Sequence, residues 1–489
     1  MTIEASTRNK LLFQLSEVLP ENFLLTTEEE LRPYECDGLA AYKRLPVAVA
    51  LPNSIEQVQQ IVQICSQLKV PVVARGAGTG LSAGALPHEG GIVLGLSRFS
   101  KIVSIDTDNL TAVVQPGVRN LAISEAASPY GLYYAPDPSS QLACSIGGNV
   151  AENSGGVHSL KYGQTVHNVM QVKIVTIDGE LITLGSETLD TPGYDLLALI
   201  TGSEGMLGII VEITVKLLPK AESVKVLMAS FDSIEDAGHA VAAIIADGII
   251  PAGLELMDKA AIHAAEDFVH ANYPLDVAAI LLCELDGDDI QLAEQVEKVD
   301  ALLKDKKAVA VEIADSPEEQ ARLWAGRKAA FSAAGRISAD YYCMDGTIPR
   351  KQIAYVLKRI TELSEKYGLR VVNVFHAGDG NLHPLILYDA SIDGELETTE
   401  KFGGDILELC VEVGGTITGE HGVGYEKIDQ MCVQFNDAEL TQFFAVKRAF
   451  DADSLLNPGK VIPTLHRCAE LGGMHVHNGE LPHPELPRF

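Results

Sequence analysis

Arg75-Gly-Ala-Gly-Thr-Gly-Leu-Ser-Ala-Gly84 is a glycine-rich loop that directly follows a predicted apolar strand over residues 70–74. Closely spaced glycines let backbone N–H groups turn toward one point, where they can bind a pyrophosphate. The loop meets the G-x-G-x-x-G/A dinucleotide template only loosely, and that template requires an amphipathic helix next. Residues 86–91, Leu-Pro-His-Glu-Gly-Gly, cannot form that helix. A nicotinamide site is therefore disfavoured, whereas another kind of pyrophosphate loop and a merely tight surface loop both remain open.

Two further segments downstream share this polar, glycine-rich character. Residues 135–156 include Ala-Pro-Asp-Pro-Ser-Ser, Ile-Gly-Gly-Asn and Asn-Ser-Gly-Gly. Residues 201–208, Thr-Gly-Ser-Glu-Gly-Met-Leu-Gly, lead into a predicted strand over residues 209–218. Long loops with little regular structure are usually functional. The three segments together therefore favour a binding role for the first loop.

The pattern of apolar residues predicts two principal domains. The first contains short strands and a helix over residues 55–68, whose apolar residues lie on one face after a capping Ser54. Past Pro219, helices alternate with strands as in an α+β domain built on an antiparallel sheet. The predicted divisions are an N-terminal helical lead-in over 1–41, a ligand-binding domain over 42–220, a second domain over 221–425, a returning C-terminal helix within 426–462 and a tail over 463–489.

Composition excludes several classes of protein. The chain has 489 residues, 47% hydrophobic, and no stretch approaches the roughly 18 apolar residues of a transmembrane helix. Its net charge of −30 repels nucleic acid, and an anionic substrate would need a local arginine or lysine. The eight cysteines form no C-x-x-C pair and the N-terminus lacks a signal-peptide pattern. We therefore expect reduced thiols and a cytoplasmic location.

Two histidines flank a strong hairpin signal. His376 and His383 lie on either side of Asp379-Gly380, and Asp-Gly is typical of a two-residue β-turn. Counting outward from this turn pairs His376 with His383, with their Cβ atoms about 4.5–5.5 Å apart. That spacing suits two imidazoles on one metal. A packed hairpin without metal is the alternative.

A Glu-His dipeptide between glycines supplies a third candidate ligand. Residues 414–424, Gly-Gly-Thr-Ile-Thr-Gly-Glu-His-Gly-Val-Gly, follow an apolar approach that indicates an inward-facing end rather than a solvated turn. Glu420 would complete a site of two histidines and one carboxylate, while His421 points elsewhere. Such a site suits zinc, which we expect here, with manganese or iron as alternatives.

In order and spacing, the three glycine-rich segments resemble the FAD domain of the vanillyl-alcohol oxidase type. The resemblance implies two small α+β subdomains that hold FAD, with its pyrophosphate on the first loop. Relatives with a doubly attached flavin carry a histidine where this chain has Thr79, so we expect noncovalent FAD. The implied FAD-binding residues are Arg75, Gly76, Ala77, Gly78, Thr79, Gly80, Leu81, Pro136, Asp137, Ser139, Ser140, Gly147, Gly148, Asn149, Gly155, Gly156, Ile209, Ile210 and Asn457.

The histidine and glutamate segments resemble the C-terminal half of the flavin-linked 2-hydroxy-acid dehydrogenases, which include D-lactate, D-2-hydroxyglutarate and glycolate enzymes. The resemblance covers roughly residues 30–462. It implies that His376, His383 and Glu420 bind a divalent metal and that His421 lies by the flavin. Residues 34–39, 324–328, 342–349 and 457–489 resemble the flavin-bearing subunits of bacterial glycolate oxidases. Relatives that act on larger diacids carry a lysine near Cys343, and its absence favours a small monocarboxylate.

These features predict an FAD-dependent oxidation of a small 2-hydroxy acid, glycolate or D-lactate, to the 2-oxo acid. The metal is expected to lower the pKa of the substrate hydroxyl. His421 is expected to accept its proton. Arg327 is the expected partner of the substrate carboxylate, because it shares one helical face with Trp324 and Phe331; a surface arginine is the alternative.

The glycolate oxidase resemblance also implies partners. These are an iron–sulfur subunit and a second flavin-domain subunit that receive electrons, with peripheral association at the inner face of the membrane through them. The alternatives are a dehydrogenase of the D-lactate or D-2-hydroxyglutarate type that acts alone, a non-catalytic flavoprotein-like subunit, a binding module for small acids or metals and a metal-dependent hydrolase. The sequence does not decide between these classes, and it does not identify the substrate, the metal or the electron acceptor.

Overall fold

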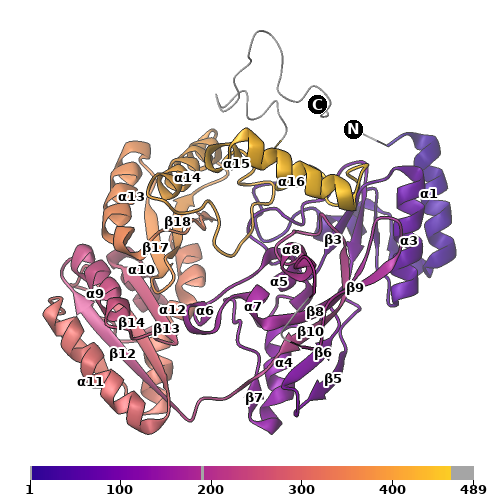
Figure 1. Cartoon of the computed structure of the whole chain (residues 1–489). Coiled ribbons are helices and arrows are strands. Elements are labelled where there is room, and N and C mark those ends of the chain that lie inside the picture. The colour runs from indigo at the N-terminus through magenta and orange to yellow at the C-terminus, as the bar shows by residue number, and fades with distance from the viewer. Residues whose placement is uncertain (1–2, 189–191, 464–489) are drawn as a thin grey trace. The chain divides into compact units, whose positions relative to one another are not determined.

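The computed structural model describes residues 3–188 and 192–463 (Figure 1). These residues form two compact units. The described part of unit 1 combines residues 3–154, 164–219 without 189–191, and 421–463. Unit 2 combines Gly155–Gly163 with Lys220–Glu420. The predicted tail lies outside the described residues beyond residue 463.

Unit 1 is built on three sheets. The four-stranded sheet has the order β1-β2-β4-β3, in which β2, β4 and β3 run parallel. The antiparallel five-stranded sheet has the order β5-β6-β10-β8-β9, and β11 pairs with β7. The strands are β1 (Leu24–Leu25), β2 (Ala48–Ala50), β3 (Val72–Arg75), β4 (Ile92–Gly95), β5 (Ile102–Asp106), β6 (Thr111–Val114), β7 (Leu132–Tyr133), β8 (Val169–Val175), β9 (Leu181–Gly185), β10 (Ile209–Lys216) and β11 (Leu218–Pro219).

The helices of unit 1 pack against these sheets around two large hydrophobic cores and a smaller third cluster. Strand β10 contributes to both cores, because Ile209 and Val211 lie in one and Ile210 and Ile213 in the other. Two subdomains, as expected, therefore share this strand. The helices are α1 (Ala5–Val18), η1 (Glu21–Phe23), α2 (Glu28–Leu31), η2 (Arg32–Tyr34), α3 (Ile55–Leu68), α4 (Asn120–Ala127), η3 (Ser128–Tyr130), α5 (Ile146–Glu152), α7 (Thr165–Asn168), α8 (Leu196–Ile200), α15 (Met431–Gln434) and α16 (Asp437–Phe450).

Helix α3 shows how local sequence sets an element. Its N-cap Ser54 accepts a hydrogen bond from the Gln57 N–H, and its buried side chains are spaced three and four residues apart. Lys69 ends the helix in the left-handed conformation, φ 54°. The predicted bounds of residues 55–68 are confirmed.

Unit 2 is built on one antiparallel sheet of seven strands, in the order β15-β12-β14-β13-β17-β18-β16. This confirms the predicted α+β class with an antiparallel sheet. Helices α9 and α11 lie side by side on β12 and β14 (Figure 1), and every residue of β18 is buried. The elements are α6 (Ser159–Tyr162), β12 (Ser223–Phe231), α9 (Ile234–Ala246), β13 (Gly253–Asp258), α10 (Lys259–Val269), β14 (Ala279–Gly287), α11 (Asp289–Asp305), β15 (Ala310–Ile313), α12 (Pro317–Ile337), β16 (Asp340–Cys343), η4 (Arg350–Gln352), α13 (Ile353–Tyr367), β17 (Val371–His376), β18 (Asn381–Tyr388) and α14 (Glu395–Glu412).

The β17–β18 hairpin departs from its predicted register. His376 pairs with Asn381, and His383 pairs with Val374, so the predicted pairing of His376 with His383 is wrong. The connecting loop comprises residues 377–380 rather than the two residues of an Asp-Gly turn. It closes through a hydrogen bond from the Gly380 N–H to the His376 carbonyl. Because Val374 and His376 are two residues apart, both histidines nevertheless lie on one face of the sheet.

Two further observations bear on the expectations from composition. The cysteines at positions 36, 65, 144, 283, 343 and 410 are free thiols, whereas Cys432 is disulfide-bonded, so the expectation of reduced thiols is wrong at Cys432. Among the helices of residues 3–188 and 192–463, none has the length and apolar character needed to cross a membrane.

The hairpin loop generates a first prediction. Gly380 has φ +86°, and a Cβ there would lie 2.1 Å from the Ile348 carbonyl oxygen. Gly380→Ala should therefore lower the free energy of unfolding by clearly more than the roughly 1 kcal/mol expected for backbone strain alone. Gly368→Ala is the control, because φ there is +68° but no atom lies within 4 Å of the added Cβ. Equal losses of thermal stability in the two variants would contradict the predicted clash.

Candidate active site

Three potential ligand atoms converge in unit 2. His376 at the end of β17 and His383 on β18 face each other with ring centroids 5.0 Å apart. Glu420 Oε1 lies 3.5 Å from His376 Nε2 and 3.0 Å from His383 Nε2. The three ligand atoms all lie within 4.8 Å of one another, and both histidines are almost fully buried. The three residues expected from the sequence as metal ligands thus lie close together in the structure.

These separations fit a divalent metal. Two ligands that each lie about 2.1 Å from a tetrahedral zinc are about 3.4 Å apart. Burial raises the pKa of Glu420, but hydrogen bonds and charges from His376 and His383 outweigh it and hold that pKa well below its usual range. Burial lowers the pKa of His376, but Glu255 and then Glu420 raise it well above its usual range. The surrounding carboxylates therefore favour positive charge, as a metal ion would supply.

Glu255 on β13 orients the first imidazole. It lies directly opposite His376 in the β13–β17 ladder and is 1% exposed. His376 Nδ1 lies 2.8 Å from Glu255 Oε1. If Nδ1 carries the proton and donates it there, the Nε2 lone pair is left for a metal. Glu255 was not predicted from the sequence, because a single acidic residue in an apolar strand forms no motif.

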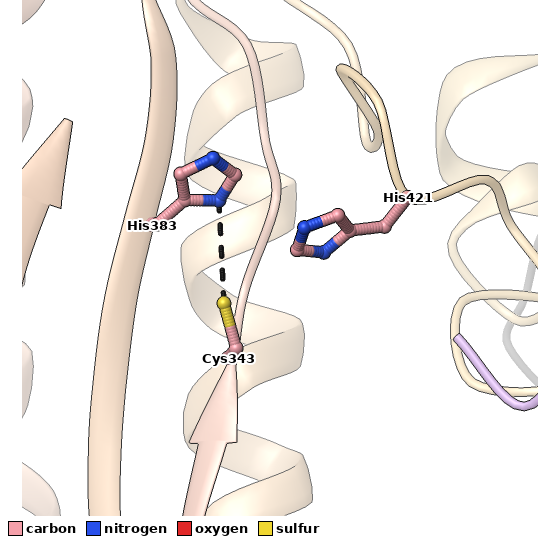
Figure 2. Close-up of side chains that lie close together, drawn as sticks. All are labelled: Cys343, His383 and His421. Carbon is pink, nitrogen blue, oxygen red and sulfur yellow. Dashed lines mark hydrogen bonds between the residues drawn. The ribbon is translucent and has the colours of Figure 1, made fainter. Parts of the chain in front are cut away.

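The second imidazole has its own partners. His383 Nδ1 lies 3.3 Å from the Met344 carbonyl oxygen and 4.0 Å from Cys343 Sγ. Figure 2 shows the Cys343 thiol directed at this ring nitrogen. Both contacts leave His383 Nε2 for Glu420 or a metal. Cys343 thus lies beside the candidate ligand His383.

Arg327 on α12 is buried rather than on the surface. It is 2% exposed, and its Nε donates a 2.7 Å hydrogen bond to Glu255 Oε2. Its Nη2 atom lies 2.7 Å from the same oxygen but makes no hydrogen bond within the described residues. On the same helix, the Phe331 ring lies 6.3 Å from the His383 ring. Arg327 and Phe331 of the predicted face of α12 therefore lie beside the histidine cluster, and Arg327 retains a donor group without a hydrogen-bond partner within the described residues.

The first glycine-rich loop of unit 1 has the properties of an anion-binding loop. None of the backbone N–H groups from Gly76 to Gly84 donates a hydrogen bond within the described part of the chain. The Ser82 and Ser145 hydroxyls are buried and also lack a hydrogen-bond partner there. Buried polar groups rarely stay unsatisfied, so the loop fits a ligand with many acceptor oxygens, such as a pyrophosphate.

Most of the other predicted FAD-binding residues also lie in unit 1. A Cβ on Gly76 would lie 2.1 Å from Ser145 Oγ, so the loop lies against the start of α5. Asn457 donates hydrogen bonds to the Gly84 and Glu204 carbonyls and thus joins the C-terminal segment to the first and third glycine-rich segments. Residues 147–149 lie on α5, residues 209 and 210 on β10, and residues 136–140 between β7 and α5. Gly155 and Gly156 instead belong to unit 2.

His421 is the first residue of the last segment of unit 1. It directly follows Glu420 in the chain, and consecutive Cα atoms are about 3.8 Å apart. The polypeptide itself therefore keeps the predicted base next to the predicted metal ligand.

A dinucleotide-type loop in one unit and a histidine–carboxylate cluster on the sheet of the other define a two-domain flavin-linked oxidoreductase. The chain belongs to the FAD-linked oxidases: the FAD binding domain matches residues 46–185, and the C-terminal domain of FAD linked oxidases matches residues 220–461. FAD is thus its cofactor, as predicted, and an enzyme is favoured over a binding module or a non-catalytic subunit.

Curated relatives agree along nearly the whole chain. Glycolate oxidase subunit GlcD of Escherichia coli (strain K12) is 62% identical over 482 residues, 99% of this chain and 97% of the relative. GlcD of Bacillus subtilis (strain 168) is 41% identical, over 90% and 94% of the two chains. D-lactate dehydrogenase of Anaerostipes hadrus is 33% identical, over 92% and 97%. The predicted resemblance to glycolate oxidase flavin subunits is confirmed.

Solved structures confirm the predicted fold. p-Cresol methylhydroxylase has a TM-score of 0.80 at 18% identity, over 94% of this chain and 97% of the other. 4-Ethylphenol oxidase from Gulosibacter chungangensis has a TM-score of 0.78 at 17% identity, over 95% and 99%. At such identities the likeness concerns the fold alone, which is that of the vanillyl-alcohol oxidase type.

The first loop generates a prediction about FAD. Gly78 has φ +72°, and a Cβ there would lie 2.2 Å from Arg75 Nη2. Gly78→Val should distort the loop and lower the FAD content of the purified protein, measured from the flavin absorbance per chain. Gly131→Val is the control, since φ there is +69° with no atom within 4 Å of the Cβ. Full FAD content in the Gly78 variant would show that this loop does not hold the dinucleotide.

Proposed function

We propose that this protein oxidises a small 2-hydroxy acid, first of all glycolate, to the 2-oxo acid. The observation that carries the proposal is its 62% identity, over 99% of its length, to a glycolate oxidase subunit. The convergence of His376, His383 and Glu420 supports the same chemistry, since a hydroxyl oxygen is a natural metal ligand. A D-lactate dehydrogenase is the second candidate, favoured by 33% identity to enzymes of that name.

Unit 1 is the proposed FAD domain and unit 2 the proposed substrate and metal domain. FAD, when bound, supplies the two-electron acceptor for the hydrogen on the substrate α-carbon. The proposed FAD-binding residues are those predicted from the sequence. We propose that the flavin is held without a covalent bond, because Thr79 offers no ring nitrogen for attachment.

The proposed metal ligands are His376 Nε2, His383 Nε2 and Glu420. Zinc is the first choice, with manganese and iron as alternatives. Such a cation supplies Lewis acidity that lowers the pKa of the substrate hydroxyl. Glu255 keeps His376 turned toward the metal by accepting a hydrogen bond at Nδ1, and His421 accepts the hydroxyl proton.

Arg327 is the proposed partner of the substrate carboxylate. Its Nη2 group has no hydrogen-bond partner within the described residues, and it lies on the helix face that also carries Phe331 beside His383. Glu255 neutralises part of the charge of Arg327. Hydrogen bonds from the Arg327 N–H groups, more than net charge, would therefore stabilise the bound substrate carboxylate. In a chain of net charge −30, a buried arginine is a suitable local cation.

The relatives named glycolate oxidase subunits suggest an assembly. We propose that an iron–sulfur subunit and a second flavin-domain subunit receive the electrons from FAD. The complex would lie in the cytoplasm, with peripheral association at the inner face of the membrane through these partners.

The substrate proposal is tested by steady-state kinetics with an artificial dye acceptor. Glycolate should give the highest kcat/KM, D-lactate a lower value, and D-2-hydroxyglutarate the lowest, since Cys343 adds no cation for a second carboxylate. A preference for D-lactate would favour the second candidate. Activity with none of the three acids would contradict both.

The binding mode of FAD is tested by acid precipitation of the yellow protein. The flavin should remain in the supernatant, where its absorbance is measured. Colour that stays in the denatured pellet would contradict noncovalent binding.

Three experiments distinguish the role of the metal from the role of the base His421. Chelation should abolish turnover while the flavin spectrum persists, and added metal should restore it. His383→Ala should resemble the chelated enzyme, but added metal should not restore it, because one ligand is lost. His421→Ala should keep metal and FAD yet lose about 10²–10⁴-fold in the rate of flavin reduction.

The exposed His263 of unit 2 provides the control, and His263→Ala should leave metal content and rate unchanged. A metal-free protein that reduces its flavin at the normal rate would remove the metal from the chemistry. The base would then have to act without it.

A further inference from the structure

The segment that carries Glu420 and His421 connects the two units. Unit 2 ends at Glu420 and unit 1 resumes at His421. The proposed metal ligand and the proposed base are therefore consecutive residues on either side of this division. Their backbone must be fixed on both sides if both side chains are to keep their orientation.

On the unit 2 side, the anchor is the carboxylate of Asp345, which follows β16 and is fully buried. Its Oδ2 accepts the Gly419 N–H at 3.1 Å, and its Oδ1 accepts the Glu420 N–H at 3.1 Å. Two side chains also donate to this carboxylate, Thr418 Oγ1 at 2.5 Å and Asn381 Nδ2 at 3.0 Å. A buried carboxylate is costly unless such donors surround it, so this arrangement holds one defined backbone path.

On the unit 1 side, the anchor is the carboxylate of Glu204, in the third glycine-rich segment. It is 5% exposed. Its Oε1 accepts the Val423 N–H at 2.7 Å, and its Oε2 accepts the Gly424 N–H at 2.8 Å. The backbone of Glu204 is fixed in turn, because its N–H donates to the Ala151 carbonyl and its carbonyl accepts from Asn457. Glu204 adopts φ +50°, an uncommon conformation for a residue with a side chain.

Only His421 and Gly422 lie between the two anchors. Gly422 has φ +79°, and a Cβ there would lie 2.2 Å from Glu152 Oε2 and 2.7 Å from Glu204 Oε1. A glycine is thus required for the chain to turn against the Glu204 carboxylate. The direction of the Cα–Cβ bond of His421 then follows from the backbone that the two carboxylates hold.

We propose that Asp345 and Glu204 are positioning residues for the oxidation, each acting through two consecutive backbone N–H groups. Asp345 fixes Glu420 for the metal, and Glu204 fixes the turn that presents His421. This inference rests on the proposed roles of Glu420 and His421. The two residues should have separate effects, because Asp345 acts on the affinity for the metal and Glu204 acts on kcat.

The test compares Asp345→Asn and Glu204→Gln in the full-length, FAD-loaded protein. Each amide replaces one acceptor oxygen with an NH₂ group that faces a backbone N–H. Asp345→Asn should weaken zinc binding by about 10–100-fold in a chelator competition, with FAD content unchanged. Glu204→Gln should keep zinc affinity and KM while kcat falls by about 100-fold, since small misplacements of a reacting group cost that much.

Matched controls are Glu312→Gln in unit 2 and Glu212→Gln in unit 1, both members of surface ion pairs. They should leave zinc affinity and kcat unchanged. If Glu204→Gln does not fold, Gly422→Ala is the second variant, because its added Cβ disturbs the same contact while the carboxylate remains. It should lower kcat at unchanged zinc affinity.

Unchanged zinc affinity in Asp345→Asn, or unchanged kcat in the folded Glu204→Gln or Gly422→Ala variant, would overturn the assigned role of that anchor. A parallel loss of FAD content, zinc and thermal stability in either variant would also overturn it, because it would indicate a merely structural role. Failure of the proposed function itself is distinguishable. In that case, chelation of the unmodified protein and the His421→Ala substitution would each leave full activity.

Discussion

The carboxylate of Glu420 between two buried imidazoles is the interaction on which the candidate site depends. Isolated buried charges are very costly, and a buried pair is stable only when hydrogen bonds and opposite charges surround it. Here His376 and His383 contact Glu420 from two adjacent strands, and Glu255 contacts His376 from a third. The seven-stranded sheet is thus a rigid support that places three separate segments of chain around one point.

The sequence was sufficient where local rules determine structure. Helix α3 has a serine cap and regular apolar spacing, and its bounds follow from them. The register of β17 and β18 did not follow from the Asp-Gly signal, because the loop makes hydrogen bonds that this signal does not reveal. The Gly380 carbonyl accepts the Ile348 N–H, and Asp379 Oδ1 accepts the Asn381 N–H. These two hydrogen bonds stabilise the four-residue loop over residues 377–380 in place of a two-residue turn.

The members of the candidate cluster could be identified from their motifs, whereas the partners of those residues could not. Glycine-rich segments that indicate a functional site carry His376, His383 and Glu420. Glu255 lies in an ordinary apolar strand, and only the pairing of β13 with β17 sets it opposite His376. Asp345 and Glu204 likewise act on backbone N–H groups more than 70 residues away in sequence. Such contacts are properties of the folded chain and have no local signature.

Glu255 also shapes what Arg327 can do. The same carboxylate accepts from His376 through Oε1 and from Arg327 through Oε2, so it joins the candidate metal ligand to the candidate carboxylate partner. An unpaired arginine at this depth would carry a large desolvation cost in the absence of substrate. Glu255 removes that cost and leaves the Nη2 group of Arg327 as a donor. A strongly acidic protein can in this way keep a cation ready for an anionic substrate without an uncompensated charge in its core.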